Sequence, residues 1–166
     1  MNIVGRGVEA LVRVLFVCLG NICRSPMAEA LFRHKVKEAG LEDRIEVDSA
    51  GTGDWHIGSP PHHGTRRILD QYRISYEGIA ARQITPKDFH HYQYIVAMDR
   101  SNLANLSRIA PASHQAEIKL MMDYVGNAAV KEVPDPYYTG NFEEVYELLE
   151  EGCTRLLEHI RQREGL

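Results

Sequence analysis

The feature that most constrains the fold of this chain is a junction between an apolar run at 11–17 and a helical pattern at 26–40. The run is short and rich in branched apolar residues, which predicts a buried strand. The connecting segment reads Cys18-Leu-Gly-Asn-Ile-Cys-Arg24-Ser25. A thiol and a guanidinium are therefore expected within one tight turn between a strand and a helix.

Strands and helices alternate along the rest of the chain. We expect strands at 11–17, 44–49, 92–98 and 117–121, helices at 26–40, 60–73, 100–109 and 142–162, and a short helical turn at 86–91. This alternation predicts an α/β fold, a three-layer sandwich in which a central four-stranded parallel sheet carries helices on both faces. We place the first strand inside the sheet and a phosphate-binding loop after it, because such folds bind ligands at the carboxyl ends of their strands.

A single domain is expected over residues 11–163, because a chain of 166 residues can bury one substantial core and no internal repeat divides it. Residues 1–10 are expected to form a flexible N-terminal extension. Their segment Gly5-Arg-Gly-Val-Glu-Ala10 matches a dinucleotide-binding fingerprint in letters, but it precedes the first strand, whereas the true motif follows one.

Charge and composition narrow the classes of partner. The formal net charge of −4 and the lack of a basic stripe argue against nucleic acid. No apolar run approaches the roughly 20 residues that span a bilayer, so no membrane partner is expected. Three cysteines, one of them needed as a thiolate, fit a reducing compartment, and we expect a cytoplasmic monomer.

The turn after the first strand is predicted to bind an anion, because unpaired N–H groups at a helix start converge there and the helix dipole adds positive potential. Arg24 supplies a planar fork for two phosphate or arsenate oxygens. The same field favours a thiolate nucleophile at Cys18 near neutral pH. Gly20 and Asn21 suit a positive-φ turn. Ser25 can donate a hydrogen bond to the Cys18 sulfur.

Ordinary structural roles compete with these interpretations. A cysteine after a buried strand is commonly a small core residue, although that role leaves the rest of the octapeptide unexplained. The pairs His62-His63 and His90-His91 are expected on the solvated surface, because adjacent side chains point apart and no third metal ligand is evident. The acidic residues at 143–151 are expected to form the solvent-exposed face of a helix.

Several motifs occur in a fixed order along the chain. They are Cys18-Leu-Gly-Asn-Ile-Cys-Arg-Ser-Pro26, Ser49-Ala-Gly-Thr52, Asp54-Trp55, Ala81-Arg-Gln-Ile84, Ala97-Met-Asp-Arg-Ser-Asn102 and Pro134-Asp-Pro-Tyr-Tyr138. With these motifs the chain resembles the low-molecular-weight protein tyrosine phosphatases, and the resemblance covers nearly the whole chain.

The resemblance implies hydrolysis of phosphotyrosine and small aryl phosphates through a cysteinyl-phosphate intermediate. Cys18 is then the nucleophile, Arg24 binds the phosphate, and Ser25 belongs to the catalytic set. Asp135 is the general acid and later the general base, held by its flanking prolines. The reaction needs no metal and no cofactor, and the implied partners are tyrosine-phosphorylated proteins.

Substrate binding is expected at the loop and at three aromatic side chains around its mouth. The residues so assigned are Leu19, Gly20, Asn21, Ile22, Cys23, Trp55, Tyr137 and Tyr138. The aromatic side chains would wall a slot deep enough for a phenyl phosphate. Ile22 is similar to the residue of tyrosine-directed members, whereas relatives that act on phosphoarginine carry threonine there.

Two alternative functions remain open. Arsenate reduction would use the same anion site, but its disulfide relay needs two further cysteines, and Cys153 lies far away in a predicted helix. A phosphotyrosine-binding module without turnover would fit a chain that had lost Cys18 or Asp135, and both are present.

Two further roles follow from the loop. Cys23 either fills space behind the loop or serves as the redox partner of Cys18 in a protective disulfide. Ser49 is expected to support the loop. Many eukaryotic members add a histidine at the position of Ile79, so the partners of Asn21 and Ser49 are open at this point.

Overall fold

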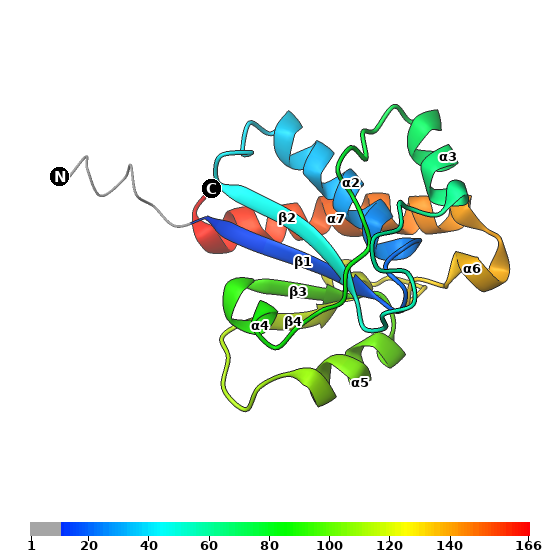
Figure 1. The fold of residues 1–166 in the computed structure, drawn as a ribbon. Coiled ribbons are helices and arrows are strands. Elements are labelled where there is room, and N and C mark those ends of the chain that lie inside the picture. The colour runs from blue at the N-terminus through cyan, green and yellow to red at the C-terminus, as the bar shows by residue number, and fades with distance from the viewer. Residues whose placement is uncertain (1–10) are drawn as a thin grey trace.

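The computed structural model describes residues 11–166, and the extension expected at 1–10 lies outside the described residues. The elements, in chain order, are β1 (Val12–Cys18), α2 (Arg24–Glu38), β2 (Ile45–Gly51), α3 (His63–Gln71), α4 (Asp88–His91), β3 (Tyr94–Ala97), α5 (Arg100–Ile109), β4 (Glu117–Leu120), the 3-10 helix η1 (Met121–Tyr124), α6 (Pro136–Thr139) and α7 (Phe142–Glu164). Figure 1 shows them as one sheet flanked by helices.

The four strands are parallel and lie in the order β2-β1-β3-β4. β1 pairs along its whole length with β2 and through 14–17 with β3. The α/β fold with a central four-stranded parallel sheet and an interior first strand is therefore confirmed. β2 lies on one side of β1, and β3 and β4 lie on the other, so the strand order reverses at β1. The carboxyl end of β1 is therefore at a topological switch point, where open α/β sheets bind their ligands.

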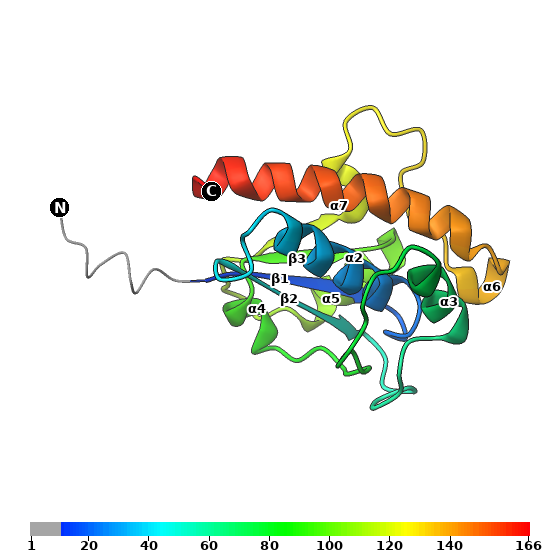
Figure 2. The ribbon, with the colours of Figure 1, turned by 90° about the horizontal axis from the view of Figure 1, so that it is seen from above.

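Alternation along β1 builds two cores. Val14 and Phe16 pack on one face of the sheet with residues of α2 and α7, and Leu15 and Val17 pack on the other face with residues of α4 and α5. Figure 2 shows α2 and α7 on the upper side of the sheet and α4 on the lower side. Each such fully buried side chain contributes about 1.5–3 kcal/mol. Burial on both faces explains why β1 is a continuous apolar run.

The observed elements differ from the sequence expectation in several places, of which three bear on the site. α2 begins at Arg24, two residues before the expected start, so the arginine belongs to the first turn of the helix. α3 begins at His63, because the side chain of His62 caps it by accepting from the N–H of Gly64. The short α6 was not expected; Asp135 caps it and Pro136 occupies its first position.

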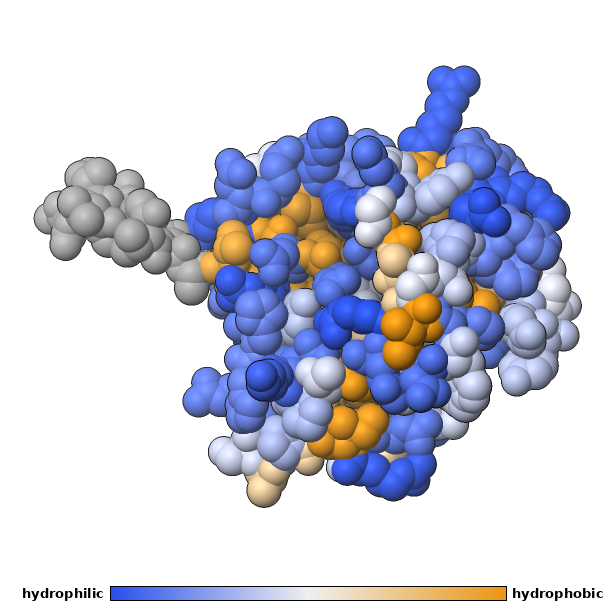
Figure 3. Space-filling model, in the orientation of Figure 1, coloured by the Kyte–Doolittle hydropathy of each residue, from blue (hydrophilic) through white to orange (hydrophobic). Residues whose placement is uncertain are grey.

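The surface is mostly polar. In Figure 3 the apolar residues of one face form small patches separated by hydrophilic residues. Between residues 11 and 166, no helix is both long and apolar enough to cross a bilayer.

Candidate active site

A loop at 19–23 connects the last residue of β1, Cys18, to the first residue of α2, Arg24. Carbonyl oxygens at both ends of this loop accept hydrogen bonds from residues outside it. The hydrogen bonds run from Thr52 N to Cys18 O (3.0 Å), Gly53 N to Leu19 O (2.9 Å), His62 N to Ile22 O (2.7 Å) and Thr65 Oγ1 to Cys23 O (3.1 Å). A trans peptide places its N–H opposite its C=O, so a loop whose carbonyls face outward turns N–H groups inward.

The inward N–H groups have no protein acceptor. In the described part of the chain, the backbone N–H groups of residues 19–23 donate no hydrogen bond. Buried or half-buried donors without acceptors are costly, and the start of α2 adds the positive end of its dipole at the same place. The loop is therefore a preformed cradle for an anion.

A side-chain network holds the loop from behind. The backbone N–H of Arg82 donates to Asn21 Oδ1 at 2.9 Å, which identifies the other end of the amide as Nδ2. That nitrogen donates to Ser25 Oγ at 2.7 Å and to Ser49 Oγ at 3.0 Å. Ser25 Oγ lies 3.0 Å from Cys18 Sγ. Since Ser25 already accepts from the amide, its own proton is left for the sulfur, as a thiolate requires.

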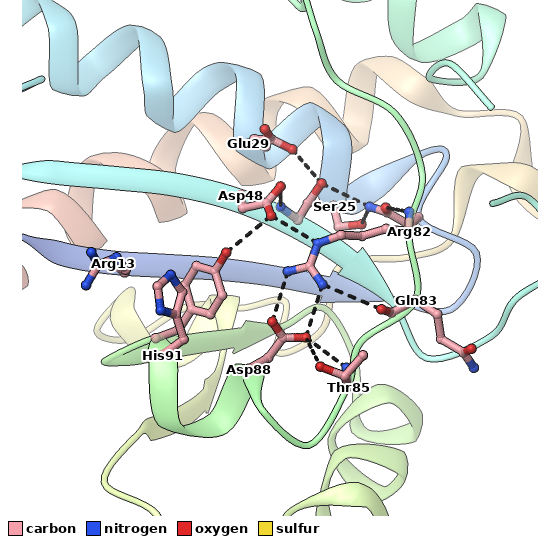
Figure 4. Close-up of polar contacts among 12 residues, drawn as sticks. Arg13, Ser25, Glu29, Asp48, Arg82, Gln83, Thr85, Asp88 and His91 are labelled. Carbon is pink, nitrogen blue, oxygen red and sulfur yellow. Dashed lines mark hydrogen bonds and ion pairs between the residues drawn. The ribbon is translucent and has the colours of Figure 1, made fainter. Parts of the chain in front are cut away.

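The network ends at a buried carboxyl group. Ser49 Oγ donates to Glu29 Oε1 at 2.6 Å, and Figure 4 shows Glu29 reaching from α2 toward β2. Burial raises the pKa of Glu29 to about 7, against the opposing effect of the Ser49 hydrogen bond. Ile79 is buried in the apolar core. Glu29 and the backbone N–H of Arg82 thus supply the partners that the sequence left open for Asn21 and Ser49.

Arg24 is fixed at the inner wall of the loop and is almost fully buried. Its Nη1 donates to Asp99 Oδ2 at 2.7 Å and to the carbonyl of Val133 at 2.9 Å. Burial opposes the charge, but the nearby Cys18, Asp99 and Asp135 raise the pKa of this guanidinium. Its buried Nε has no partner in the described structure. One edge of the fork is anchored by Asp99 and Val133, and the unpartnered Nε on the other edge is available to an anion.

Asp135 approaches the loop from the far end of the sequence. Its Oδ2 lies 3.5 Å from Arg24 Nη2, and its Oδ1 accepts from the N–H of Tyr137 at 3.1 Å. The cap on α6 and the proline on either side orient the carboxyl group. The fold therefore brings Cys18, Arg24 and Asp135 to one site.

A cavity of about 310 Å³ opens over these groups. It is lined by Cys18, Leu19, Gly20, Ile22, Cys23, Arg24, Trp55, His56, Asp135, Tyr137 and Tyr138. Trp55, Tyr137 and Tyr138 are largely exposed at its rim, with the two tyrosine rings edge to face at 5.4 Å. The side chains of Asn21, Ser25 and Ser49 do not line the cavity; they lie behind the loop.

Some details of the site differ from the sequence expectation. The positive φ lies at Asn21 (57°), while Gly20 does not adopt one. Gly20 instead leaves space beside the cavity, because a Cβ there would lie 3.1 Å from the His56 ring, a tight contact. Sequence reasoning also missed His56, Glu29 and Asp99, although adjacency to Trp55 was a signal for the first.

The two other cysteines differ in their surroundings. Burial and the neighbouring Cys18 raise the pKa of Cys23 to about 12, so this residue is a protonated thiol in the cavity wall. Its role as a redox partner stays a prediction. Cys153 is fully buried, with Sγ 3.9 Å from the carbonyl of Ala28, and packs α7 against α2.

Known proteins share this fold and much of this sequence. A family model described as low molecular weight phosphotyrosine protein phosphatase matches residues 13–165. The chain is 51% identical over 156 residues to the low molecular weight protein-tyrosine-phosphatase YfkJ of Bacillus subtilis (strain 168), covering 94% of this chain and 100% of that protein. The crystal structure of YfkJ matches with a TM-score of 0.91 at 50% identity, covering 95% and 99% of the two chains. The crystal structure of a Drosophila arginine phosphatase matches with a TM-score of 0.83 at 38% identity, covering 89% and 97%.

Proposed function

This chain belongs to the low molecular weight phosphotyrosine protein phosphatase family, and on that premise we propose that it hydrolyses phosphotyrosine through a covalent phosphate on Cys18. The observation that supports the proposal most directly is the cradle of unpaired N–H groups, bounded by Cys18 and the unpaired Nε of Arg24. A phosphoryl group of three equatorial oxygens satisfies both sets of donors.

The proposed reaction has two displacements. The Cys18 thiolate attacks phosphorus, an S–P bond forms, and the bond from phosphorus to the tyrosyl oxygen breaks as Asp135 gives that oxygen its proton. Water then attacks phosphorus and passes a proton to Asp135, and the S–P bond breaks to return the thiolate. Ser25 donates to the sulfur in its anionic state, which lowers the cost of its departure.

Phosphotyrosine is favoured over phosphoarginine by the cavity wall. Ile22 lines the cavity together with Trp55 and Tyr137, so the leaving group is surrounded by apolar and aromatic surface. A phenyl ring suits this wall, whereas a guanidino group would carry several N–H groups to a cavity whose lining offers Asp135 as its single carboxylate acceptor. The 38% identity to an arginine phosphatase makes the comparison necessary, and phosphoarginine is the second substrate to assay.

Arsenate reduction is less well supported. A disulfide relay needs a mobile, accessible third cysteine, and Cys153 is fully buried between α7 and α2. All three cysteines are free, in keeping with the proposed cytoplasmic location and a reduced nucleophile.

We also propose that residues 11–163 form one domain, because α7 packs on α2 through a core continuous with β1. The expected monomer stays a prediction.

The test is metal-free hydrolysis of p-nitrophenyl phosphate by the wild type and two variants. Cys18→Ser should abolish turnover, because it removes the nucleophile. Asp135→Asn should lower kcat by about 10²–10⁴-fold, the range for loss of a general acid. Asp54→Asn removes an exposed carboxyl of the neighbouring loop that does not line the cavity, and it should leave kcat unchanged.

Three results would count against the mechanism: no hydrolysis by folded, reduced wild type, full activity of Cys18→Ser, or equal losses in the two aspartate variants. Parallel assays with phosphotyrosine, phosphoserine and phosphoarginine then define the leaving group. Turnover of phosphoarginine at a kcat/KM above that for phosphotyrosine would contradict the assignment from Ile22.

A further inference from the structure

A second hollow lies beside the active-site cavity, between the loop at 52–55 and the end of α5. We call it the α5 groove; its volume is about 210 Å³ and it is lined by Leu19, Thr52, Gly53, Trp55, Asn105, Arg108 and Ile109. Leu19 and Trp55 also line the active-site cavity. The two hollows therefore share one wall, and Trp55 forms the ridge between them.

The groove is built on the same backbone that holds the nucleophile. Thr52 and Gly53 donate their N–H groups to the carbonyls of Cys18 and Leu19 at 3.0 and 2.9 Å. The Trp55 ring fills the space that a side chain at Gly53 would need, since a Cβ there would lie 1.9 Å from the ring. The glycine thus leaves room for the Trp55 ring, and the two backbone hydrogen bonds hold the loop that carries the ring against the backbone of the nucleophile.

Charge sets the kind of group that the groove can hold. Arg108 is the single charged residue among those that line it. One nitrogen of its guanidinium donates to Asn105 Oδ1, and the other N–H groups form no hydrogen bond within the described residues. Asp54, which follows Gly53, is exposed and lines neither hollow. Leu19, Trp55 and Ile109 form the apolar walls of the groove beside the Arg108 guanidinium.

The path of a protein substrate brings a neighbouring side chain to this place. The rim of the active-site cavity is formed by Trp55, Tyr137 and Tyr138, so we infer that a phosphotyrosine with its phosphate at Cys18 leads its backbone out past these side chains. The chain advances at most about 3.3–3.6 Å per residue, and the next side chains on that side therefore meet the shared wall within one to three residues. The α5 groove is the hollow on the other side of that wall.

Resting on the proposed function, we propose that the α5 groove is a subsite for an acidic side chain that flanks phosphotyrosine in a protein substrate. The methylene part of a glutamate or aspartate packs on Leu19 and Trp55, and the carboxylate pairs with Arg108. This contact is the same in the ground state and the transition state, so it lowers KM and leaves kcat unchanged.

Phosphotyrosine peptides of equal length test the proposal. Each carries one glutamate or, at the same position, one glutamine, from three residues before the phosphotyrosine to three after it. In the wild type the ratio of kcat/KM for the glutamate peptide over the glutamine peptide should reach about two- to fivefold at positions on one side, the range for an ion pair at a surface. The ratio should fall toward one as ionic strength rises.

Arg108 variants assign the preference to the groove. In Arg108→Gln the ratio should fall to about one, Arg108→Lys should keep part of it, and in Arg108→Glu lysine should be preferred over glutamine at the same position. The matched control is Arg67→Gln, which removes the same charge from an exposed position on α3 outside both hollows and should keep the wild-type ratio.

The proposal is overturned if no position prefers glutamate, or if the preference persists in Arg108→Gln. p-Nitrophenyl phosphate has no peptide that could reach the groove, so its hydrolysis distinguishes failure of the subsite from failure of the proposed function. A wild type that hydrolyses this compound but shows no acidic preference retains the proposed function and loses the subsite. A wild type without any hydrolysis loses both.

Discussion

At the scale of single residues, Asn21 determines how the reactive sulfur is supported. Its carbonyl oxygen accepts from Arg82, and its two amide hydrogens go to Ser25 and Ser49. That assignment leaves one hydroxyl proton for Cys18 and one for Glu29. Every hydrogen bond in the chain from Glu29 to the sulfur then has a defined direction, and the loop keeps its shape without a ligand.

Glu29 makes stability depend on pH. Unfolding returns its pKa from about 7 to the ordinary value of 4.5, so between these values the folded state binds a proton that the unfolded state releases. Stability therefore falls as pH rises through this window. Asp48, Arg33 and Arg82 are the charged groups that face it.

We predict that Glu29→Gln removes this dependence. The glutamine keeps an acceptor for Ser49 but has no proton to lose. The wild type should therefore lose stability relative to the variant as pH rises from 5 to 8, by at most roughly 3 kcal/mol. Urea unfolding at the two pH values measures this, with Glu42→Gln, an exposed glutamate, as the control. Parallel pH profiles of the wild type and Glu29→Gln would contradict the prediction.

At the scale of elements, α3 and α7 meet through aromatic rings beside the active site. The Phe142 ring stacks on His62 at 5.2 Å, and His62 donates its backbone N–H to the carbonyl of Ile22. Gly64 lies against the same ring, where a Cβ would come within 2.5 Å of two ring carbons. The contact between the two helices thus also positions the loop at 19–23.

Gly64→Ala should therefore lower the free energy of unfolding by about 1–3 kcal/mol, although alanine favours helix, because overpacking moves the Phe142 ring. Chemical denaturation measures the change. Gly126→Ala, where a Cβ meets open space, is the matched control and should be close to neutral. The loss should shrink when Phe142→Ala is added, and an equal loss in that background would rule out the clash.

At the scale of the whole molecule, the sheet order creates the site. β1 lies between β2 and β3, so the loop after β1 is met by the ends of both neighbours. The segment after β2 holds its carbonyls, and the segment after β3 supplies Asp99, which binds Arg24 with one oxygen and caps α5 with the other. Donors for an anion remain unpaired because the fold holds them in place.

Inorganic phosphate should for this reason stabilise the entire fold. An anion that binds the native state alone adds RT ln(1 + [L]/Kd), about 2.7 kcal/mol at 100 times its Kd. Thermal unfolding should shift upward with phosphate and not with chloride at equal ionic strength. Arg24→Lys should reduce the shift, because an ammonium group cannot bind two oxygens in the same geometry. An unchanged shift in that variant would mean that phosphate binds elsewhere.

The sequence by itself determined the parts that are local. The apolar run, the turn and the helix after it predict β1, the loop and α2, and they place Cys18 and Arg24 in one cradle, because neighbours along the chain have few other arrangements. The alternation of strands and helices predicts the sheet. The local pattern offered both Gly20 and Asn21 for a positive φ, of which only Asn21 adopts one, and it did not predict that α2 starts at Arg24.

Only the tertiary structure decided which distant groups meet. Asp99 is 75 residues from Arg24, and Ser49 is 20 residues from Glu29, so neither pair has a pattern in the sequence. Their pairing follows from the order of the strands and from burial, which leaves a polar group no partner except the one that the fold brings to it. For the same reason the α5 groove is visible only after α5 has packed beside the loop that carries Trp55.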